Sequence, residues 1–200
     1  MRELDEAAQR AFKILGEADI PALIMGGYAM SAYGYRRYTE DIDVVVQDHK
    51  KAIQVLKENG YTEGKLWFKL VDPEGLVGID VLPSGVKMSG NDINNPVAEK
   101  VSLMPEFLDL KNLIRTKLGA VVSGRSPVGV PEKNTSDIIE LIKRNDLPRG
   151  FLGEISQGFA ETSEDLIRME FDSLWDKLHD PSELSKRGEW YDPFEEFLHE

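Results

Sequence analysis

Two aspartates that are two residues apart, Asp41 and Asp43, lie in the segment DIDVVV, whose other residues are apolar and mostly β-branched. This composition is typical of a β-strand, and in a strand the side chains of residues i and i+2 point to the same face. Burying two carboxylates that repel each other is costly unless their charge is compensated. A divalent cation such as Mg²⁺, which prefers hard oxygen ligands, would compensate it. The alternative is that both acids meet solvent at the end of a strand.

A third carboxylate, Asp80, occurs in the segment VGIDVL, where apolar residues surround it. We expect this segment to be the second strand of a hairpin. If it lies beside the strand of Asp41 and Asp43, three carboxylates converge, and such a cluster favours a metal site. The alternative is that Asp80 pairs with a nearby lysine or arginine.

Several other residues could bind a phosphate group. Gly26 and Gly27 follow a short apolar run and precede a predicted helix, so the backbone could approach an anion there; a simple tight turn is the alternative. Arg37 could make bidentate contacts with phosphate, or it could pair with Glu40 at the surface. Lys117 lies on the apolar stripe of a predicted helix. Its ammonium group could extend towards solvent or point at buried negative charge.

The spacing of apolar residues predicts alternating helices and strands, followed by a helical region. Strands are expected at residues 20–25, 41–46, 67–71 and 76–82, and helices at 3–18, 27–34, 48–60, 105–122, 134–144, 148–158 and 162–178. This order predicts an α/β (α+β) fold, in which a mixed β-sheet core is flanked by helices. We place the α/β core at residues 1–125 and a helical C-terminal region with an acidic tail at residues 126–200.

The net charge of the 200-residue chain is −12, and much of the excess lies near its end. Residues 151–200 contain 14 of the 36 acidic residues but only 4 of the 24 basic residues. Such a tail would repel a phosphate backbone, so general DNA binding is not expected. A local basic site within residues 1–150 remains compatible with this charge distribution.

The sequence contains no cysteine, which excludes disulfides, zinc–thiolate sites and thiol nucleophiles. No apolar run approaches the roughly 20 residues that a membrane span requires. The acidic start MRELDEAAQR lacks the apolar stretch of a signal peptide. We therefore expect a cytoplasmic protein without membrane association.

The segment IMGGYAMSAYGYRRYTEDIDVVV resembles the signature of the polymerase-β-like nucleotidyltransferase superfamily. That signature consists of a strand, a Gly-Gly or Gly-Ser pair, a short helix, an Asp-x-Asp motif and a further acidic residue on a later strand. The matching positions of this chain are Gly26, Gly27, Asp41, Asp43 and Asp80.

Within that superfamily, the segment RYTEDID is most similar to the group that contains the AbiEii-type abortive-infection toxins and their uncharacterised relatives. In that group, a helix with a lysine is followed by a helix with a lysine and an aspartate. Lys117 in LKNLIRTKLGA and Asp137 in EKNTSDIIELIKRNDL match these residues. The resemblance covers residues 20–147, and residues 150–200 match no family.

The resemblance implies an enzyme that transfers a nucleoside monophosphate from a nucleoside triphosphate, such as ATP, to an acceptor hydroxyl group. Asp41, Asp43 and Asp80 would hold two Mg²⁺ ions. Asp80 would also deprotonate or orient the acceptor oxygen. Gly26 and Gly27 would contact the β- and γ-phosphates.

The resemblance also implies that Arg37, Thr39 and Lys117 neutralise or position phosphate oxygens as pyrophosphate leaves. An RNA or protein hydroxyl would be the acceptor, and an antitoxin would be a partner. A small-molecule enzyme similar to aminoglycoside and lincosamide nucleotidyltransferases is one alternative, and the charge of −12 would suit a cationic acceptor. A non-catalytic nucleotide-binding module and an α/β domain whose acids are only surface residues are the others.

Overall fold

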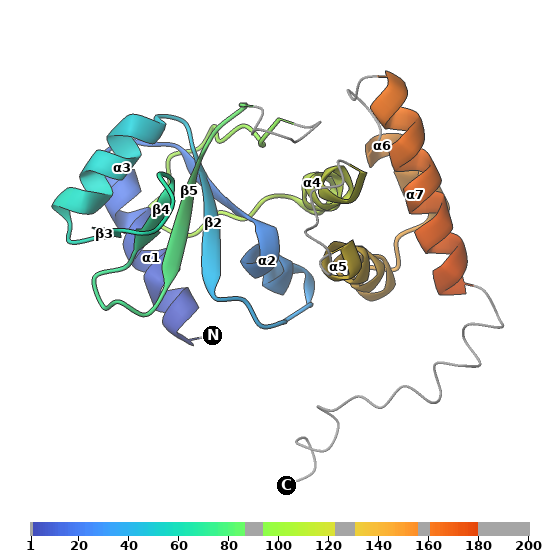
Figure 1. The fold of residues 1–200 in the computed structure, drawn as a ribbon, viewed down its shortest axis with the longest axis horizontal. Helices are drawn as coiled ribbons and strands as arrows, with labels where there is room; N and C mark the ends of the chain where they lie inside the picture. Colours follow the sequence, from blue (N-terminus) through green and yellow to red (C-terminus); the bar gives the residue numbers. More distant parts are fainter. Residues whose placement is uncertain (1, 87–93, 123–130, 156–160, 180–200) are drawn as a thin grey trace, which may run out of the picture.

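The computed structural model describes residues 2–86, 94–122, 131–155 and 161–179 (Figure 1). Its strands are β1 (Ala22–Met25), β2 (Asp41–Val46), β3 (Thr62–Glu63), β4 (Lys69–Val71) and β5 (Gly78–Pro83). Its α-helices are α1 (Arg2–Glu17), α2 (Gly26–Ala29), α3 (His49–Glu58), α4 (Leu110–Val122), α5 (Pro131–Arg144), α6 (Leu152–Ile155) and α7 (Glu161–His179). Two 3₁₀ turns complete the described elements, Met30–Tyr33 and Arg149–Phe151. The last part of the predicted acidic tail, from residue 180 onwards, lies outside the described residues.

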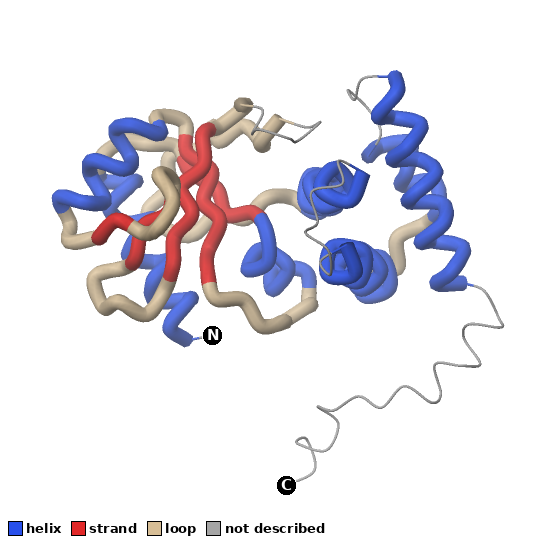
Figure 2. The backbone as a smooth tube through the Cα atoms, viewed as in Figure 1, coloured by secondary structure: helices blue, strands red, loops and turns tan. Residues whose placement is uncertain are grey.

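The five strands form one sheet in the order β1-β2-β5-β4-β3, coloured red in Figure 2. β2 and β5 are parallel, whereas the other neighbouring strands are antiparallel. This mixed sheet, with helices around it, confirms the predicted α/β (α+β) class. β2 and β5 lie in the interior of the sheet, which explains why their sequences are dominated by apolar residues.

Helices α1 and α3 lie together on one side of the sheet (Figure 1). The apolar side of α1 is buried, and Phe12 has no exposed surface. Ile42 of β2 and Ile79 of β5 belong to the same hydrophobic core. Because side chains alternate along a strand, the aspartates next to these isoleucines project from the opposite face of the sheet.

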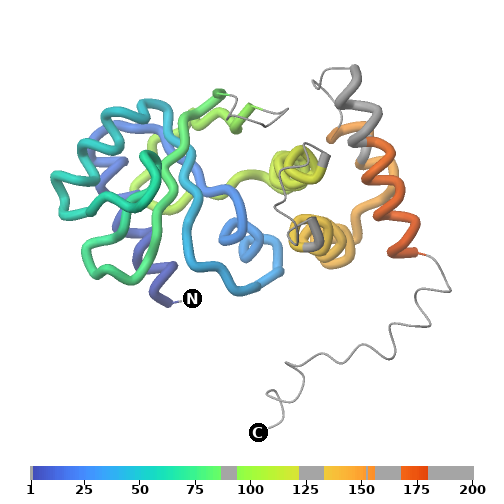
Figure 3. Tube along the Cα trace, in the orientation of Figure 1, coloured from blue at the N-terminus to red at the C-terminus, as the bar shows by residue number. Residues whose placement is uncertain are grey.

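On that opposite side, α2 lies close to β2, and α4, α5 and α7 pack together as a helical layer (Figures 1 and 3). The buried residues of this layer include Leu113, Ile138 and Leu174. The predicted domain boundary after residue 125 lies outside the described residues, and the division into two domains stays a prediction. Within the described parts of the chain, no helix is both long and apolar enough to span a membrane.

Helix α4 begins at Leu110 and not at residue 105 as predicted. The preceding residues are extended, and Phe107 forms an isolated parallel bridge with Ile24 of β1. Asp109 then caps the helix, because its carboxylate accepts a hydrogen bond from the backbone N–H of Asn112 at 3.0 Å. The predicted start at Pro105 is therefore wrong, because residues 105–109 contact the sheet edge and cap the helix.

Candidate active site

The parallel pairing of β2 with β5 brings the three predicted carboxylates to one place. Asp43 lies directly opposite Asp80, and Asp41 lies opposite Gly78, at the start of both strands. Side-chain alternation directs all three carboxylates to the same face of the sheet. The expected adjacency of the two strands is therefore confirmed.

A lysine that the sequence did not single out lies between two of these carboxylates. Lys69 of β4 is in register with Asp80. Its Nζ donates a hydrogen bond to Oδ2 of Asp41 at 3.0 Å and lies 3.4 Å from Oδ1 of Asp80. Asp80 thus has the nearby cation that was its alternative interpretation. The predicted hairpin contained a signal for this contact, since it places Lys69 and Asp80 on neighbouring strands.

The ionisation of these groups reflects burial and crowding. Burial, followed by the charges of Asp41 and Asp80, raises the pKa of Asp43 to about 7. Burial also raises the pKa of Asp80, and the positive charge of Lys69 opposes this rise. Burial lowers the pKa of Lys69, but its contacts with Asp41 and Asp80 outweigh burial and hold that pKa above its usual value. The cluster therefore attracts further positive charge.

The donor chemistry of this cluster fits a divalent cation. Carboxylate oxygens are suitable Mg²⁺ ligands, and Oδ1 of Asp80 is buried without a hydrogen bond. In the part of the chain that the structure describes, no three acidic or histidine side chains are already gathered as a metal site. The ammonium group of Lys69 lies between Asp41 and Asp80. Asp43 and Asp80, which face each other in register, are the best-placed ligands.

The bend formed by Gly26 and Gly27 lies close to the carboxylate of Asp43 and to the side chains of Arg37 and Thr39. Gly26 has a φ of +71°, and a Cβ atom there would lie 1.8 Å from Oδ2 of Asp43. A Cβ atom on Gly27 would lie 2.8 Å from Nη2 of Arg37 and 3.1 Å from Oγ1 of Thr39. The positive φ requires glycine at position 26, whereas at position 27 a side chain would displace Arg37 or Thr39. The bend joins the acidic cluster to the predicted phosphate-binding residues.

Arg37 and Lys117 meet at a buried aspartate of α5. Nε and Nη2 of Arg37 donate to the two carboxylate oxygens of Asp137 at 2.8 and 3.0 Å. Nζ of Lys117 donates to Oδ2 of Asp137 at 2.6 Å, and both residues are buried. Lys117 thus points inwards to negative charge, one of the two alternatives for this residue. Burial lowers the pKa of Lys117, and the charge of Asp137 opposes this.

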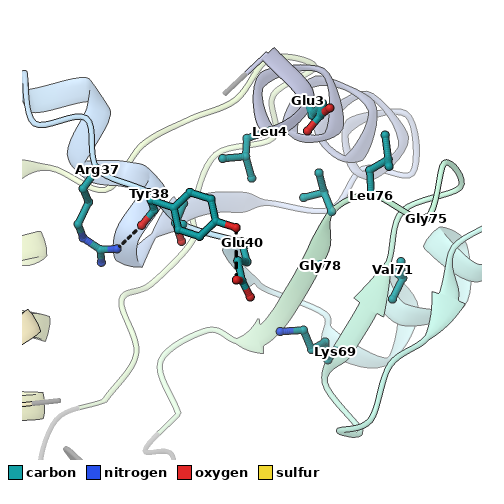
Figure 4. Close-up of a pocket in the computed structure, with 12 residues that line it drawn as sticks. Glu3, Leu4, Arg37, Tyr38, Glu40, Lys69, Val71, Gly75, Leu76 and Gly78 are labelled. Atoms are coloured by element: carbon teal, nitrogen blue, oxygen red, sulfur yellow. Dashed lines mark hydrogen bonds between the residues drawn. The ribbon is translucent and has the colours of Figure 1, made fainter. Parts of the chain in front are cut away.

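A pocket of about 490 Å³ lies beside the cluster (Figure 4). Arg37, Thr39 and Lys69 contribute to its walls, as do two acidic residues, Glu3 of α1 and Glu40. The three aspartates, the two glycines and Lys117 do not line this pocket, although Thr39 and Lys69, which do, both contact Asp41. Their roles in catalysis and nucleotide binding stay predictions.

Comparison with known proteins supports the fold. No protein-family profile matches the chain, and no curated protein matches it. The structure is similar to that of an antigenic nucleotidyltransferase-like protein from Paracoccidioides brasiliensis, with 20% identity, coverage of 92% of this chain and 91% of that chain, and a TM-score of 0.55. The antibiotic-resistance factor ANT(2'')-Ia gives 15% identity, coverage of 88% and 93%, and a TM-score of 0.49. The first similarity shows that the chain has a nucleotidyltransferase-like fold.

Proposed function

We propose that this protein is a nucleotidyltransferase that moves a nucleoside monophosphate from a nucleoside triphosphate to an acceptor hydroxyl group. The main support is the placement of Asp43 opposite Asp80 on parallel central strands, directly beside the Gly26–Gly27 bend. An acidic cluster next to a bend without side chains is suited to a metal-bound triphosphate. The similarity of the fold to a nucleotidyltransferase-like protein is consistent with this function.

Asp43 and Asp80, with Asp41, would hold Mg²⁺ in this function. The cation would neutralise phosphate charge and lower the energy of the displacement at phosphorus. Protons compete for the same oxygens, because burial and like charges raise the pKa of Asp43 to about 7. Metal and triphosphate should therefore bind more tightly as the pH rises through 7.

The remaining roles belong to groups of the chain itself. Asp80 would orient the acceptor hydroxyl and accept its proton while the acceptor oxygen forms a bond to the α-phosphorus. The bond between the α-phosphorus and the bridging oxygen breaks, and pyrophosphate leaves. The backbone at Gly26 and Gly27 would lie against the β- and γ-phosphates, where a side chain would interfere.

Arg37, Thr39 and Lys117 would stabilise the phosphates from the other side of the bend. Asp137 holds the guanidinium of Arg37 in place. Because Nη1 of Arg37 also donates to the backbone oxygen of Tyr38, Arg37 would act on a phosphate beside Gly27 mainly through its charge. Lys117 is only 5% exposed and would act through its positive charge.

We propose an RNA or protein hydroxyl as the acceptor, together with a toxin role and an antitoxin partner. This part of the proposal depends on the resemblance of residues 37–43, Lys117 and Asp137 to the AbiEii-type group. A small cationic acceptor is the second candidate. The pocket that includes Glu3 and Glu40, and the net charge of −12, favour it.

The function can be tested by incubating the protein with each of the four α-³²P-labelled ribonucleoside triphosphates and Mg²⁺. Separate reactions contain total tRNA, a protein mixture or an aminoglycoside, and label transfer and pyrophosphate release are both measured. We expect transfer to one acceptor class, with pyrophosphate formed in equal amount. Label on RNA or protein supports the first candidate, and label on the aminoglycoside supports the second.

The matched variants for this experiment are Asp43→Asn and Glu99→Gln. Asp43→Asn keeps the shape of a proposed ligand but removes its charge, so we expect transfer to fall by at least about a hundredfold. Glu99 is exposed and is not one of the residues proposed for the site, so Glu99→Gln should retain full activity. Equal transfer by the wild type and Asp43→Asn, or no transfer to any acceptor, would reject the proposed function.

A further inference from the structure

We propose that Lys69 is a built-in cation that occupies the second metal position of the carboxylate cluster. In consequence, the nucleotide-free protein binds one divalent ion, between Asp43 and Asp80, and not two. The proposal rests on the metal-dependent function proposed above. The two Mg²⁺ ions that the resemblance implies concern the complex with the triphosphate, whereas this proposal concerns the protein without nucleotide.

The hydrogen bonds of the cluster leave free carboxylate oxygens for one ion. Oδ2 of Asp41 accepts a hydrogen bond from Lys69 at 3.0 Å, and Oδ1 of Asp41 accepts one from Thr39 at 3.4 Å. Oδ1 of Asp80 is 3.4 Å from the lysine nitrogen. Within the described residues, neither oxygen of Asp43 nor Oδ2 of Asp80 accepts a hydrogen bond, and Oδ1 of Asp80 is buried without one. These free oxygens lie on residues that face each other across β2 and β5.

The charges lead to the same stoichiometry. When all three carboxylates are ionised, the ammonium group of Lys69 leaves two negative charges uncompensated, and one divalent ion would balance them. A second divalent ion would have to lie near the ammonium group, and like charges at such short distances repel strongly when partly buried. Lys69 therefore competes with the second ion for Asp41 and Asp80.

The surrounding backbone holds Lys69 in this position. A Cβ atom on Gly64 would lie 2.9 Å from Cγ of Lys69, and a Cβ atom on Gly78 would lie 2.9 Å from its Cε. Both flanking segments therefore have glycine where the lysine side chain passes. Figure 4 shows Lys69 at the pocket, on the strand next to that of Gly78. Because the side chain of Lys69 passes between Gly64 and Gly78, its position is more restricted than that of a lysine in an ordinary surface ion pair.

The proposal is tested by counting tightly bound Mn²⁺ ions in the nucleotide-free protein at physiological ionic strength. The electron paramagnetic resonance signal of free Mn²⁺ gives the stoichiometry. We expect one ion for the wild type and two for Lys69→Met, which keeps the length of the side chain but lacks the charge. Asp43→Asn should bind no ion, and this loss would show that the single ion of the wild type binds at Asp43.

Gly78→Ala provides a second test in which the lysine is kept. The added methyl group would displace the flexible end of Lys69, so this variant should also gain a second Mn²⁺ ion. Three control variants should still bind one ion. Lys69→Arg retains the positive charge, and Lys57→Met removes only an exposed ion pair with Glu63. In Gly150→Ala, the added Cβ meets no atom within 4 Å.

Thermal unfolding supplies a readout that is independent of ion counting. Without metal, Lys69→Met should melt below the wild type, because Asp41 and Asp80 lose their cation. Mn²⁺ should then raise its melting temperature more than that of the wild type. If Lys69→Met does not fold, the ion count of Gly78→Ala decides.

The proposal is overturned if the wild type binds no ion or two ions, or if the variant that removes or displaces Lys69 still binds one. These outcomes are separable from failure of the proposed function. A protein that binds one ion but transfers no nucleotide would leave the role of Lys69 intact. An active enzyme that binds two ions without nucleotide would retain the function and reject this role.

Discussion

The side chains around β2 and β5 differ in how well their charges are compensated. Asp41 contacts both Lys69 and Thr39, and Asp80 lies 3.4 Å from Lys69. Asp43 is influenced mainly by burial and by two neighbouring carboxylates, which raise its pKa. A residue that is unfavourable for the stability of the empty protein is a reasonable candidate for function.

We predict that Asp43→Asn stabilises the metal-free protein at pH 8 by about 2 kcal/mol. The pKa of Asp43 is raised from 3.8 to about 7, so the folded protein retains a proton that the unfolded chain releases within this range. Its contribution therefore makes the wild type less stable as the pH rises from about 4 to 7. Urea unfolding should show that the free energy of unfolding of Asp43→Asn exceeds that of the wild type at pH 8, and that this difference nearly disappears near pH 4. A gain independent of pH would contradict this, and Glu99→Gln should show no gain.

Gly26→Ala tests the close approach of the bend to Asp43. Alanine is strained at a φ of +71°, and its Cβ would lie 1.8 Å from Oδ2 of Asp43. We expect the free energy of unfolding to fall by about 2 kcal/mol and the affinity for triphosphate to fall by at least tenfold. Urea unfolding and calorimetric titration measure these effects. Gly150→Ala is the control, and an equal effect of the two substitutions would argue against a special role for Gly26.

At the scale of elements, α5 connects the helical layer to the sheet through one buried aspartate. Asp137 accepts hydrogen bonds from Arg37, which follows the 3₁₀ turn, and from Lys117 of α4. A buried carboxylate with two cations is well compensated, whereas two buried cations without it are not. The relative positions of α4, α5 and the Arg37 segment therefore depend on this residue.

Asp137→Ala should lower the free energy of unfolding by about 3 kcal/mol, because it leaves Lys117 buried without its partner. Glu140 lies on the same helix and forms an ion pair with Arg144 at the surface. Glu140→Ala should therefore change stability by less than about 1 kcal/mol. Urea unfolding of both variants checks the difference, and equal losses would show that the buried contacts of Asp137 stabilise the protein no more than a surface ion pair does.

Strong local patterns made most of the elements predictable. The β-branched segment of β2 and the polar turn before β5 identified the sheet, and side-chain alternation placed the aspartates on one face. Strand β3 has only two residues, both exposed, so it has no apolar pattern to detect. The early predicted start of α4 failed because Phe107 packs against the sheet and Asp109 provides the cap.

The candidate site was predictable to the extent that local motifs define it. The three aspartates, the diglycine and Arg37 belong to short patterns. Lys69 and Asp137 act through contacts between segments that are distant in sequence, 28 residues from Lys69 to Asp41 and 100 residues from Arg37 to Asp137. Such contacts depend on strand register and helix packing, which no local spacing determines.

At the scale of the whole molecule, one face of the sheet is covered by α1 and α3, and the face with the carboxylates is turned towards the helical layer (Figure 1). The positive charges near the site are engaged by acidic groups: Lys69 with Asp41, and Arg37 and Lys117 with Asp137. With a net charge of −12, the molecule has little to attract an extended phosphate backbone.

Accordingly, binding to random duplex DNA should be weaker than about 100 µM at physiological salt. Fluorescence anisotropy with a labelled duplex measures this affinity, and a basic DNA-binding domain serves as a positive control. Binding that is much tighter and weakens steeply with added salt would reveal a basic surface and contradict the charge argument.

A crystal structure with Mn²⁺ and a non-hydrolysable nucleoside triphosphate would test the proposed site by locating manganese from its anomalous signal. We expect a manganese peak between the carboxylates of Asp43 and Asp80, with the triphosphate lying against Gly26 and Gly27. A triphosphate bound elsewhere, with no manganese at Asp43, would contradict this expectation.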